Sequence, residues 1–311
     1  MKIAFVFPGQ GSQSVGMLDA WQGNAAVADT VARASAALSQ DLAALIAQGP
    51  AEQLNLTTNT QPAMLTAGVA LYQAWLAAGG RQPDMVAGHS LGEYAALTAA
   101  KALALEDAVR LVRIRADAMQ AAVPVGAGAM AAVLGLDDDA VRAACAQAAQ
   151  GEVVEAVNFN APAQVVIAGH KAAVERACEA AKAAGAKRAL LLPVSAPFHS
   201  SLLEPAAAVL SRALAEVAVS APAIPMVNNV DVAMPTDPAA IRDALVRQAW
   251  HPVRWVETLR AMKEQGITHV IECGPGKVLT GLVKRIDGEL TGLAITDPAS
   301  LDSVLATLGS N

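Results

Sequence analysis

The chain has 311 residues, 54% of them hydrophobic and 16% charged, which is enough apolar material for a large domain and a smaller unit. Its formal net charge of −6 argues against a general nucleic-acid-binding protein, because such proteins carry clusters of basic residues. Its three cysteines are odd in number and far apart, which predicts neither a disulfide framework nor a metal site and favours the reducing cytoplasm.

The first part of the chain alternates short apolar runs with helical patterns. Residues 3–7 form an apolar run that stops at a glycine loop, which is typical of a buried central strand rather than a signal peptide. The uncharged stretch 53–80 contains Asn, Thr and Gln, so we expect a buried helix there and no membrane span. The other elements predicted up to residue 125 are a helical region within 24–48, a helix over 62–78 with Pro62 in its first turn, a strand within 84–90, and helices over 91–102 and 106–123.

Residues 126–199 show a different order of elements. The patterns predict a strand over 129–136, a helix over 137–149, a hairpin of strands over 152–159 and 163–169, a helix over 171–184 and a strand over 187–194. This β-α-β-β-α-β order is the ferredoxin-like arrangement.

Beyond residue 200 the alternation of strands and helices resumes. The predicted elements are a helix over 202–216, a strand within 224–230, helices over 238–248 and 253–265, a strand–turn–helix join within 268–277, a strand over 292–296 and a final helix. Such alternation predicts a mainly parallel sheet covered on both faces. We therefore predict an α/β protein whose large domain, residues 1–125 and 200–311, carries an inserted ferredoxin-like subdomain, residues 126–199.

The segment "GHSLGEY" (88–94) contains the clearest chemical signal. Its first five residues match G-x-S-x-G, in which glycines leave room for a serine on a tight strand-to-helix turn. The alternative is an ordinary glycine turn with a serine that caps the next helix. Because a strand is predicted before the segment and a helix after it, we interpret Ser90 as a nucleophile.

A serine nucleophile requires a base, and His199 is the strongest candidate among five histidines. It lies in "SAPFHSSLL", where the inserted unit rejoins the large domain and loops can overhang the sheet. The acidic residues between the two positions, such as Glu93, Glu106 and Asp117, follow no obvious strand end. We therefore predict a Ser-His dyad oriented by a neutral carbonyl, which suits an activated substrate such as a thioester.

Two further positions complete the predicted site. Arg115 shares a helix face with Leu111 and Met119, and a buried arginine requires an anionic partner. That partner is either a substrate carboxylate, held by the guanidinium fork, or an acid of the protein itself; the sequence leaves both open. The loop after the first strand lacks the spacing of a dinucleotide-binding motif, and the N–H of Gln10 could instead stabilise an oxyanion.

These motifs together resemble the malonyl-CoA:acyl-carrier-protein transacylase family. The resemblance runs from residue 3 to about residue 286 and rests on Arg115 and the segments "FPGQGSQ", "GHSLGEY", "VNFNAPAQVVIAG", "PFHSSL", "LVRQ", "HPVRW" and "GPGKVLTGL". It implies an α/β-hydrolase-like large domain with a ferredoxin-like insertion. The site residues that it implies are Ser90 as nucleophile, His199 as base, the N–H groups of Gln10 and Leu91 as oxyanion hole, Arg115 as carboxylate clamp, Met119, Phe198, His89 and Asn160 in the pocket, and Gln248 as the residue whose carbonyl orients the histidine.

The resemblance also implies an activity and its partners. We expect transfer of malonyl from malonyl-CoA to the pantetheine thiol of acyl carrier protein, for fatty acid biosynthesis, with no cofactor and no metal. A trans-acting polyketide or malonate-decarboxylase malonyltransferase, a serine esterase or thioesterase, and a non-catalytic docking module are the alternatives. A basic patch for the carrier protein is expected among Lys182, Lys187, Arg188, Lys284 and Arg285.

Overall fold

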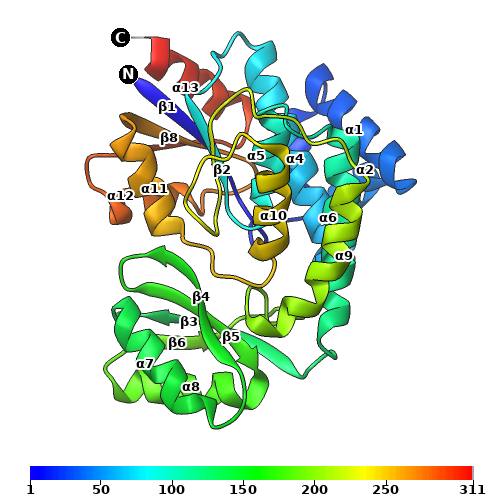
Figure 1. Ribbon diagram of the computed structural model, residues 1–311. Helices are drawn as coiled ribbons and strands as arrows, with labels where there is room; N and C mark the ends of the chain where they lie inside the picture. Colours follow the sequence, from blue (N-terminus) through cyan, green and yellow to red (C-terminus); the bar gives the residue numbers. More distant parts are fainter. Residues whose placement is uncertain (310–311) are drawn as a thin grey trace.

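The computed structural model describes residues 1–309, which form two lobes with a sheet in each (Figure 1). The larger sheet has the order β7-β2-β1-β8-β9, and all its neighbouring strands are parallel. Its strands are β1 (Lys2–Phe7), β2 (Met85–Gly88), β7 (Met226–Val227), β8 (Ile267–Cys273) and β9 (Thr291–Ile295).

Helices cover both faces of this sheet. The helices of the larger lobe are α1 (Ala25–Leu38), α2 (Leu42–Gln48), α3 (Ala51–Leu54), α4 (Thr57–Ala77), α5 (Gly92–Ala99), α6 (Leu105–Ala122), α9 (Glu204–Ala215), α10 (Pro238–Gln248), α11 (Trp255–Glu264), α12 (Thr280–Ile286) and α13 (Pro298–Gly309), with 3-10 turns η1 (Asp19–Trp21) and η2 (Ser201–Leu203). None of the helices within residues 1–309 is both long and apolar enough to cross a membrane.

The smaller lobe is an antiparallel sheet with two helices on one face. Its elements are β3 (Gly128–Leu134), α7 (Asp138–Ala149), β4 (Val154–Ala161), β5 (Gln164–His170), α8 (Lys171–Ala183) and β6 (Arg188–Leu191). The strand order β4-β5-β3-β6 is that of the predicted ferredoxin-like unit, so the predicted fold class is confirmed. The domain limits at residues 126 and 199 stay a prediction.

The sequence of β1 explains why this strand lies in the middle of the larger sheet. Alternate residues of a strand point to opposite faces, and every residue from Ile3 to Phe7 is fully buried. Ile3, Phe5 and Phe7 pack in a core with α1, α4, α5 and α6, whereas Ala4 and Val6 pack with α11 and α12. A strand that is apolar on both faces belongs in the middle of a covered parallel sheet.

The helix that contains Pro62 begins earlier than the sequence predicts. α4 starts at Thr57, so the prediction that Pro62 lies in its first turn is wrong. The backbone N–H groups of Asn59 and Thr60 already donate to the carbonyl of Leu56, which forms the first turn ahead of the proline. Proline in a helix interior removes one hydrogen bond, but α4 is buried along most of its length and tertiary packing retains it.

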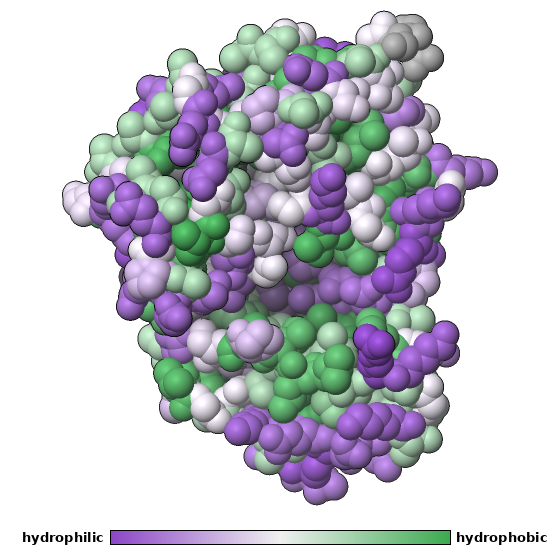
Figure 2. Space-filling model, turned by 180° about the vertical axis from the view of Figure 1, so that it is seen from behind, coloured by the Kyte–Doolittle hydropathy of each residue, from purple (hydrophilic) through white to green (hydrophobic). Residues whose placement is uncertain are grey.

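The two lobes are joined by more than the chain connections. The backbone groups of Val253, between α10 and α11, pair with Val157 and Phe159 of β4 at N···O distances of 2.8 and 3.0 Å. The carboxylate of Glu155 accepts two hydrogen bonds from Ser201, each 2.8 Å. Figure 2 shows the hollow that remains between the lobes, with apolar residues on the side of the smaller one.

Candidate active site

Ser90 occupies a sharp turn between β2 and α5, at the carboxyl edge of the larger sheet. Its φ is 54°, in the left-handed region that non-glycine residues rarely adopt. A Cβ on Gly88 would lie 1.9 Å from the backbone of Gly92, and one on Gly92 would lie 2.2 Å from the carbonyl oxygen of Phe7. Both flanking glycines are therefore sterically required, as in a nucleophile elbow.

His199 meets Ser90 across the seam between the lobes. Its Nε2 lies 2.7 Å from Ser90 Oγ, and its Nδ1 lies 2.9 Å from the carbonyl oxygen of Gln248 and 3.2 Å from that of His251. Two carbonyl acceptors require the proton on Nδ1, so the unprotonated Nε2 accepts the serine hydroxyl. His199 also has a positive φ, 66°. The structure thus brings together the predicted serine, histidine and carbonyl.

Arg115, on α6, is 1% exposed and points its guanidinium at the same serine. Its Nη1 donates to Gln61 Oε1 at 2.7 Å, and its Nη2 donates to Gln248 Oε1 at 2.9 Å and to Ser90 Oγ at 3.0 Å. Within residues 1–309 it forms no ion pair with an acid. The buried Glu93 is close enough to interact with this guanidinium through charge, but its carboxylate accepts from Asn229 and Gln248 instead, so no acid of residues 1–309 pairs directly with Arg115.

A cavity surrounds these groups, and both lobes line it. The lining residues are Gln10, Gln61, His89, Ser90, Leu91, Arg115, Met130, Asn158, Leu192, Val194, Phe198 and His199. Two predicted pocket residues lie behind this wall. Met119 Sδ is 3.9 Å from Gln61 Nε2, and Asn160 Oδ1 is 2.8 Å from His89 Nε2.

Comparison with known proteins agrees with this geometry. The acyl transferase domain family model matches residues 4–289. The malonyl CoA-acyl carrier protein transacylase of Escherichia coli K12 is 58% identical over 305 residues, which cover 98% of this chain and 99% of that protein. The chain belongs to the malonyl CoA-acyl carrier protein transacylase family.

Solved structures of this family superpose closely. The acyl-carrier-protein S-malonyltransferase of Burkholderia pseudomallei 1710b is 68% identical, with a TM-score of 0.97 over 98% of this chain and 100% of that one. A malonyl-transacylase solved in complex with a type II PKS acyl-carrier protein is 51% identical, with a TM-score of 0.97 over 99% of this chain and 100% of that one. This chain therefore shares its architecture with both of these structures.

Two side chains of this transacylase site lie outside the sequence prediction. Gln61 is buried one position before Pro62 and holds the Nη1 side of Arg115. Asn229 follows β7, and its Oδ1 accepts the backbone N–H of Ser90 at 2.8 Å. Two asparagines in succession after a buried strand, beside the strand that leads to the serine, are the signal that could have identified Asn229.

Burial and charge make the imidazole a base that stays unprotonated at acid pH. Burial, and next the charge of Arg115, lower the pKa of His199 to about 3. Burial raises the pKa of Glu93 to about 7, and the positive charge of Arg115 lowers the same pKa by a smaller amount. Removing the guanidinium therefore raises the pKa of both groups.

We accordingly expect Arg115→Ala to move the acid limb of Ser90 reactivity to higher pH. The measurement is the rate of Ser90 modification by a neutral fluorophosphonate across the pH range, because this probe has no carboxylate to bind. An acid limb at unchanged or lower pH would contradict the assigned electrostatic coupling.

Proposed function

We propose that this chain transfers malonyl from malonyl-CoA to the phosphopantetheine thiol of acyl carrier protein, in cytoplasmic fatty acid biosynthesis and without a resident cofactor. The observation that carries the proposal is the buried guanidinium of Arg115. It faces the nucleophile, with Nη2 3.0 Å from Ser90 Oγ, and has only neutral partners in the described structure. A carboxylate on the acyl group would supply a directly paired negative charge.

In the first half-reaction Ser90 becomes acylated. Its hydroxyl proton passes to Nε2 of His199 while Oγ attacks the thioester carbonyl. The negative oxygen of the tetrahedral intermediate is stabilised by the N–H groups of Gln10 and Leu91, the latter at the start of α5. The C–S bond then breaks, and the imidazolium returns its proton to the departing coenzyme A thiolate, which leaves malonyl-serine.

The second half-reaction reverses these steps with another thiol. His199 takes the proton of the pantetheine thiol, the thiolate attacks malonyl-serine, and the C–O bond breaks with return of the proton to Ser90. The hydrogen bonds from Nδ1 to Gln248 and His251 hold the ring in the same tautomer for both halves. Between the two half-reactions, Arg115 holds the carboxylate of the malonyl group on Ser90 in place.

The acceptor is a carrier protein. One neighbour, 51% identical, is solved with a type II PKS acyl-carrier protein, so a polyketide carrier is the second candidate acceptor. The side chains expected to meet the carrier are exposed, but Lys182 pairs with Glu179 and Arg285 donates to Gln164. Lys187, Arg188 and Lys284 are therefore the stronger part of the proposed basic patch.

Intact-mass measurement after mixing with malonyl-CoA tests the proposed function. We expect a malonyl adduct that holo acyl carrier protein discharges quickly and water discharges slowly. Rapid release of free malonate would identify a thioesterase instead. Comparison of fatty-acid and type II polyketide carriers in the discharge step identifies the acceptor.

Arg115→Ala is expected to lower kcat/KM for malonyl-CoA by about 10²- to 10³-fold, the usual cost of truncating one partner of a buried charge pair. Transfer from acetyl-CoA, which lacks the carboxylate, should be unchanged or faster. Arg113→Ala is the matched control, because Arg113 lies on the same helix and bonds only to Gln40 and Asn59 in the described structure. Equal losses with both donors would remove the clamp from the mechanism.

A further inference from the structure

Glu93 lies fully buried three residues after the nucleophile, in the first turn of α5. The sequence suggests no role for it, because it follows no obvious strand end, and within residues 1–309 it makes no hydrogen bond to His199. Its Oε2 accepts two hydrogen bonds, from the backbone N–H of Asn229 at 2.9 Å and from Gln248 Nε2 at 3.1 Å. Each of these two neighbours also forms hydrogen bonds with Ser90 or His199.

The first connection runs through Asn229, which is also fully buried. Its side chain spans the elbow: Oδ1 accepts the N–H of Ser90 at 2.8 Å, and Nδ2 donates to the carbonyl of Gly88 at 2.7 Å. Glu93 fixes the backbone from which this side chain extends. The strained φ of Ser90 is therefore held by an amide that the glutamate anchors.

The second connection runs through Gln248, at the end of α10. Its Nε2 donates to the carbonyl of Ser90 at 2.8 Å as well as to Glu93. Its Oε1 accepts from Arg115, and its backbone carbonyl accepts Nδ1–H of His199. One residue thus contacts the nucleophile, the clamp and the base, and Glu93 fixes its side chain.

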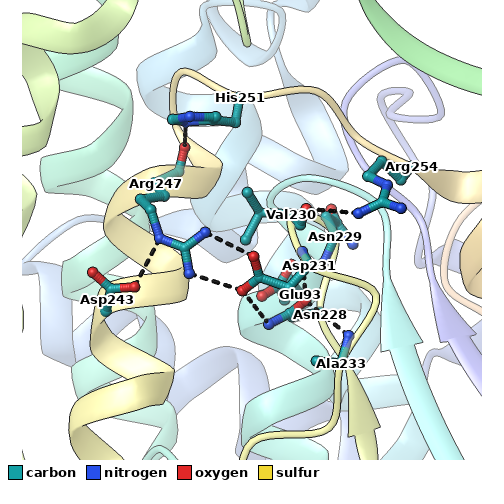
Figure 3. A network of polar contacts seen from close by, with 10 residues as sticks. All are labelled: Glu93, Asn228, Asn229, Val230, Asp231, Ala233, Asp243, Arg247, His251 and Arg254. Carbon is teal, nitrogen blue, oxygen red and sulfur yellow. Dashed lines mark hydrogen bonds and ion pairs between the residues drawn. The ribbon is translucent and has the colours of Figure 1, made fainter.

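Further polar contacts hold the loop that carries Asn229 (Figure 3). Arg247, the neighbour of Gln248, donates to both carboxylate oxygens of Asp231 at 2.8 Å. Asn228 Oδ1 accepts the backbone N–H of Asp231 at 2.9 Å. Arg247 thus ties the loop to α10 through Asp231, whereas Glu93 joins the loop and α10 to each other from inside, at the two residues that contact the nucleophile elbow.

We propose that Glu93 is a positioning residue for this acyl transfer, which keeps Ser90 and His199 in reacting geometry through the side chains of Asn229 and Gln248. The proposal rests on the proposed function for its substrate but not for its geometry. In this arrangement His199 contacts only backbone carbonyls at Nδ1, and the carboxylate of Glu93 acts on it indirectly, through Gln248.

The environments of the two carboxylate oxygens of Glu93 indicate that a glutamine would replace this residue only in part. Oε2 receives both donors, while Oε1 is buried with no hydrogen-bond partner in the described structure. A glutamine can keep an acceptor at the Oε2 position, but its NH₂ then occupies the Oε1 site without an acceptor. Alanine removes both oxygens.

Glu272 offers a matched control for burial. It is also fully buried, its Oε2 accepts two hydrogen bonds, both from Thr280, and its Oε1 has no partner among the described residues. Burial raises the pKa of both glutamates. Unlike Glu93, Glu272 makes no hydrogen bond to the serine, the histidine or their neighbours in the described structure.

The experiment compares Glu93→Ala and Glu93→Gln with the same two changes at Glu272. The readouts are kcat and KM for malonyl transfer, the melting temperature, and the rate of Ser90 modification by a neutral fluorophosphonate. Glu93→Ala is expected to lower both kcat and the modification rate by about 10²-fold, the scale for misplacing reacting groups by about 1 Å. Glu93→Gln is expected to recover part of both, and KM should change far less than kcat. The Glu272 variants should lose stability while both rates persist.

Each result decides the proposal. Normal rates in Glu93→Ala, or equal kinetic losses in the Glu272 variants, would overturn it. If Glu93→Ala does not fold, Glu93→Gln decides alone, and an unchanged rate of Ser90 modification overturns the proposal. Failure of the wild-type chain to form a malonyl adduct would instead refute the proposed function, while the fluorophosphonate rates would still test the position of Ser90.

Discussion

Ser90→Ala is expected to abolish the malonyl adduct and to lower malonyl transfer by about 10⁶-fold, the scale reported for removing a serine nucleophile that acts with its base as a unit. The reason is chemical, because the double displacement requires an oxygen that forms and then breaks a covalent bond. Methyl in place of hydroxymethyl leaves Arg115 and the cavity intact, so malonyl-CoA should still bind. Intact mass and steady-state transfer measure the two effects.

Ser200→Ala is the control for this variant. Ser200 is buried beside His199, and its Oγ donates to the carbonyl of Pro197 at 2.7 Å, so it tests the loss of a hydroxyl in the same seam. We expect the adduct to form in this variant. A malonyl adduct that persists in Ser90→Ala would place the acyl group on another residue and refute the mechanism.

The sequence predicts those parts of the molecule that depend on local rules. The strand–glycine–serine–glycine–helix order at Ser90 has a steric cause that the structure reproduces at Gly88 and Gly92. The helical phase of Arg115 shows that it faces inward, because residues three to four positions apart share a face. The order of elements is enough to identify the two kinds of sheet.

The remaining features depend on contacts between distant segments. The prediction places the start of α4 at Pro62 from the local preference of proline for the first helical turn. The helix starts at Thr57 because packing against distant segments buries it and retains the proline in its interior. Asn229 and Gln61 reach the site only through the packing of β7 and α4 against the elbow. Glu93 escapes a motif-based search for a triad acid because it acts through Gln248.

Among residues 1–309 no acid hydrogen-bonds to His199, so two backbone carbonyls determine its tautomer. Gln248 is the last residue of α10, and His251 belongs to the following segment, which joins α10 to α11 and pairs with β4 through Val253. The base is therefore held by the end of α10 and by the segment that fastens the smaller lobe to the larger one. Side-chain substitution cannot remove these acceptors, which leaves the imidazole itself as the position to test.

His199→Ala is expected to slow acylation of Ser90 by about 10⁴-fold, the upper range for loss of a general base. Without Nε2 the hydroxyl proton has no acceptor, although the oxyanion donors and Arg115 remain. Rapid-quench measurement of malonyl-enzyme formation gives the rate directly, and the residual rate should rise with pH as hydroxide replaces the base. His199→Asn separates the base from backbone strain, because asparagine tolerates the left-handed φ of 66° better than alanine.

His251→Ala is the matched control for this loss. It removes a second imidazole, whose Nδ1 donates to the carbonyl of Arg247, but it leaves in place the backbone carbonyl that His199 uses. The side chain of His251 has no part in the proton transfer, so the acylation rate should stay within about tenfold of the wild type. If His251→Ala slows acylation as much as His199→Ala, or if His199→Ala leaves the rate nearly intact, then the proton of Ser90 passes to a different group, and the 2.7 Å contact between Oγ and Nε2 is structural only.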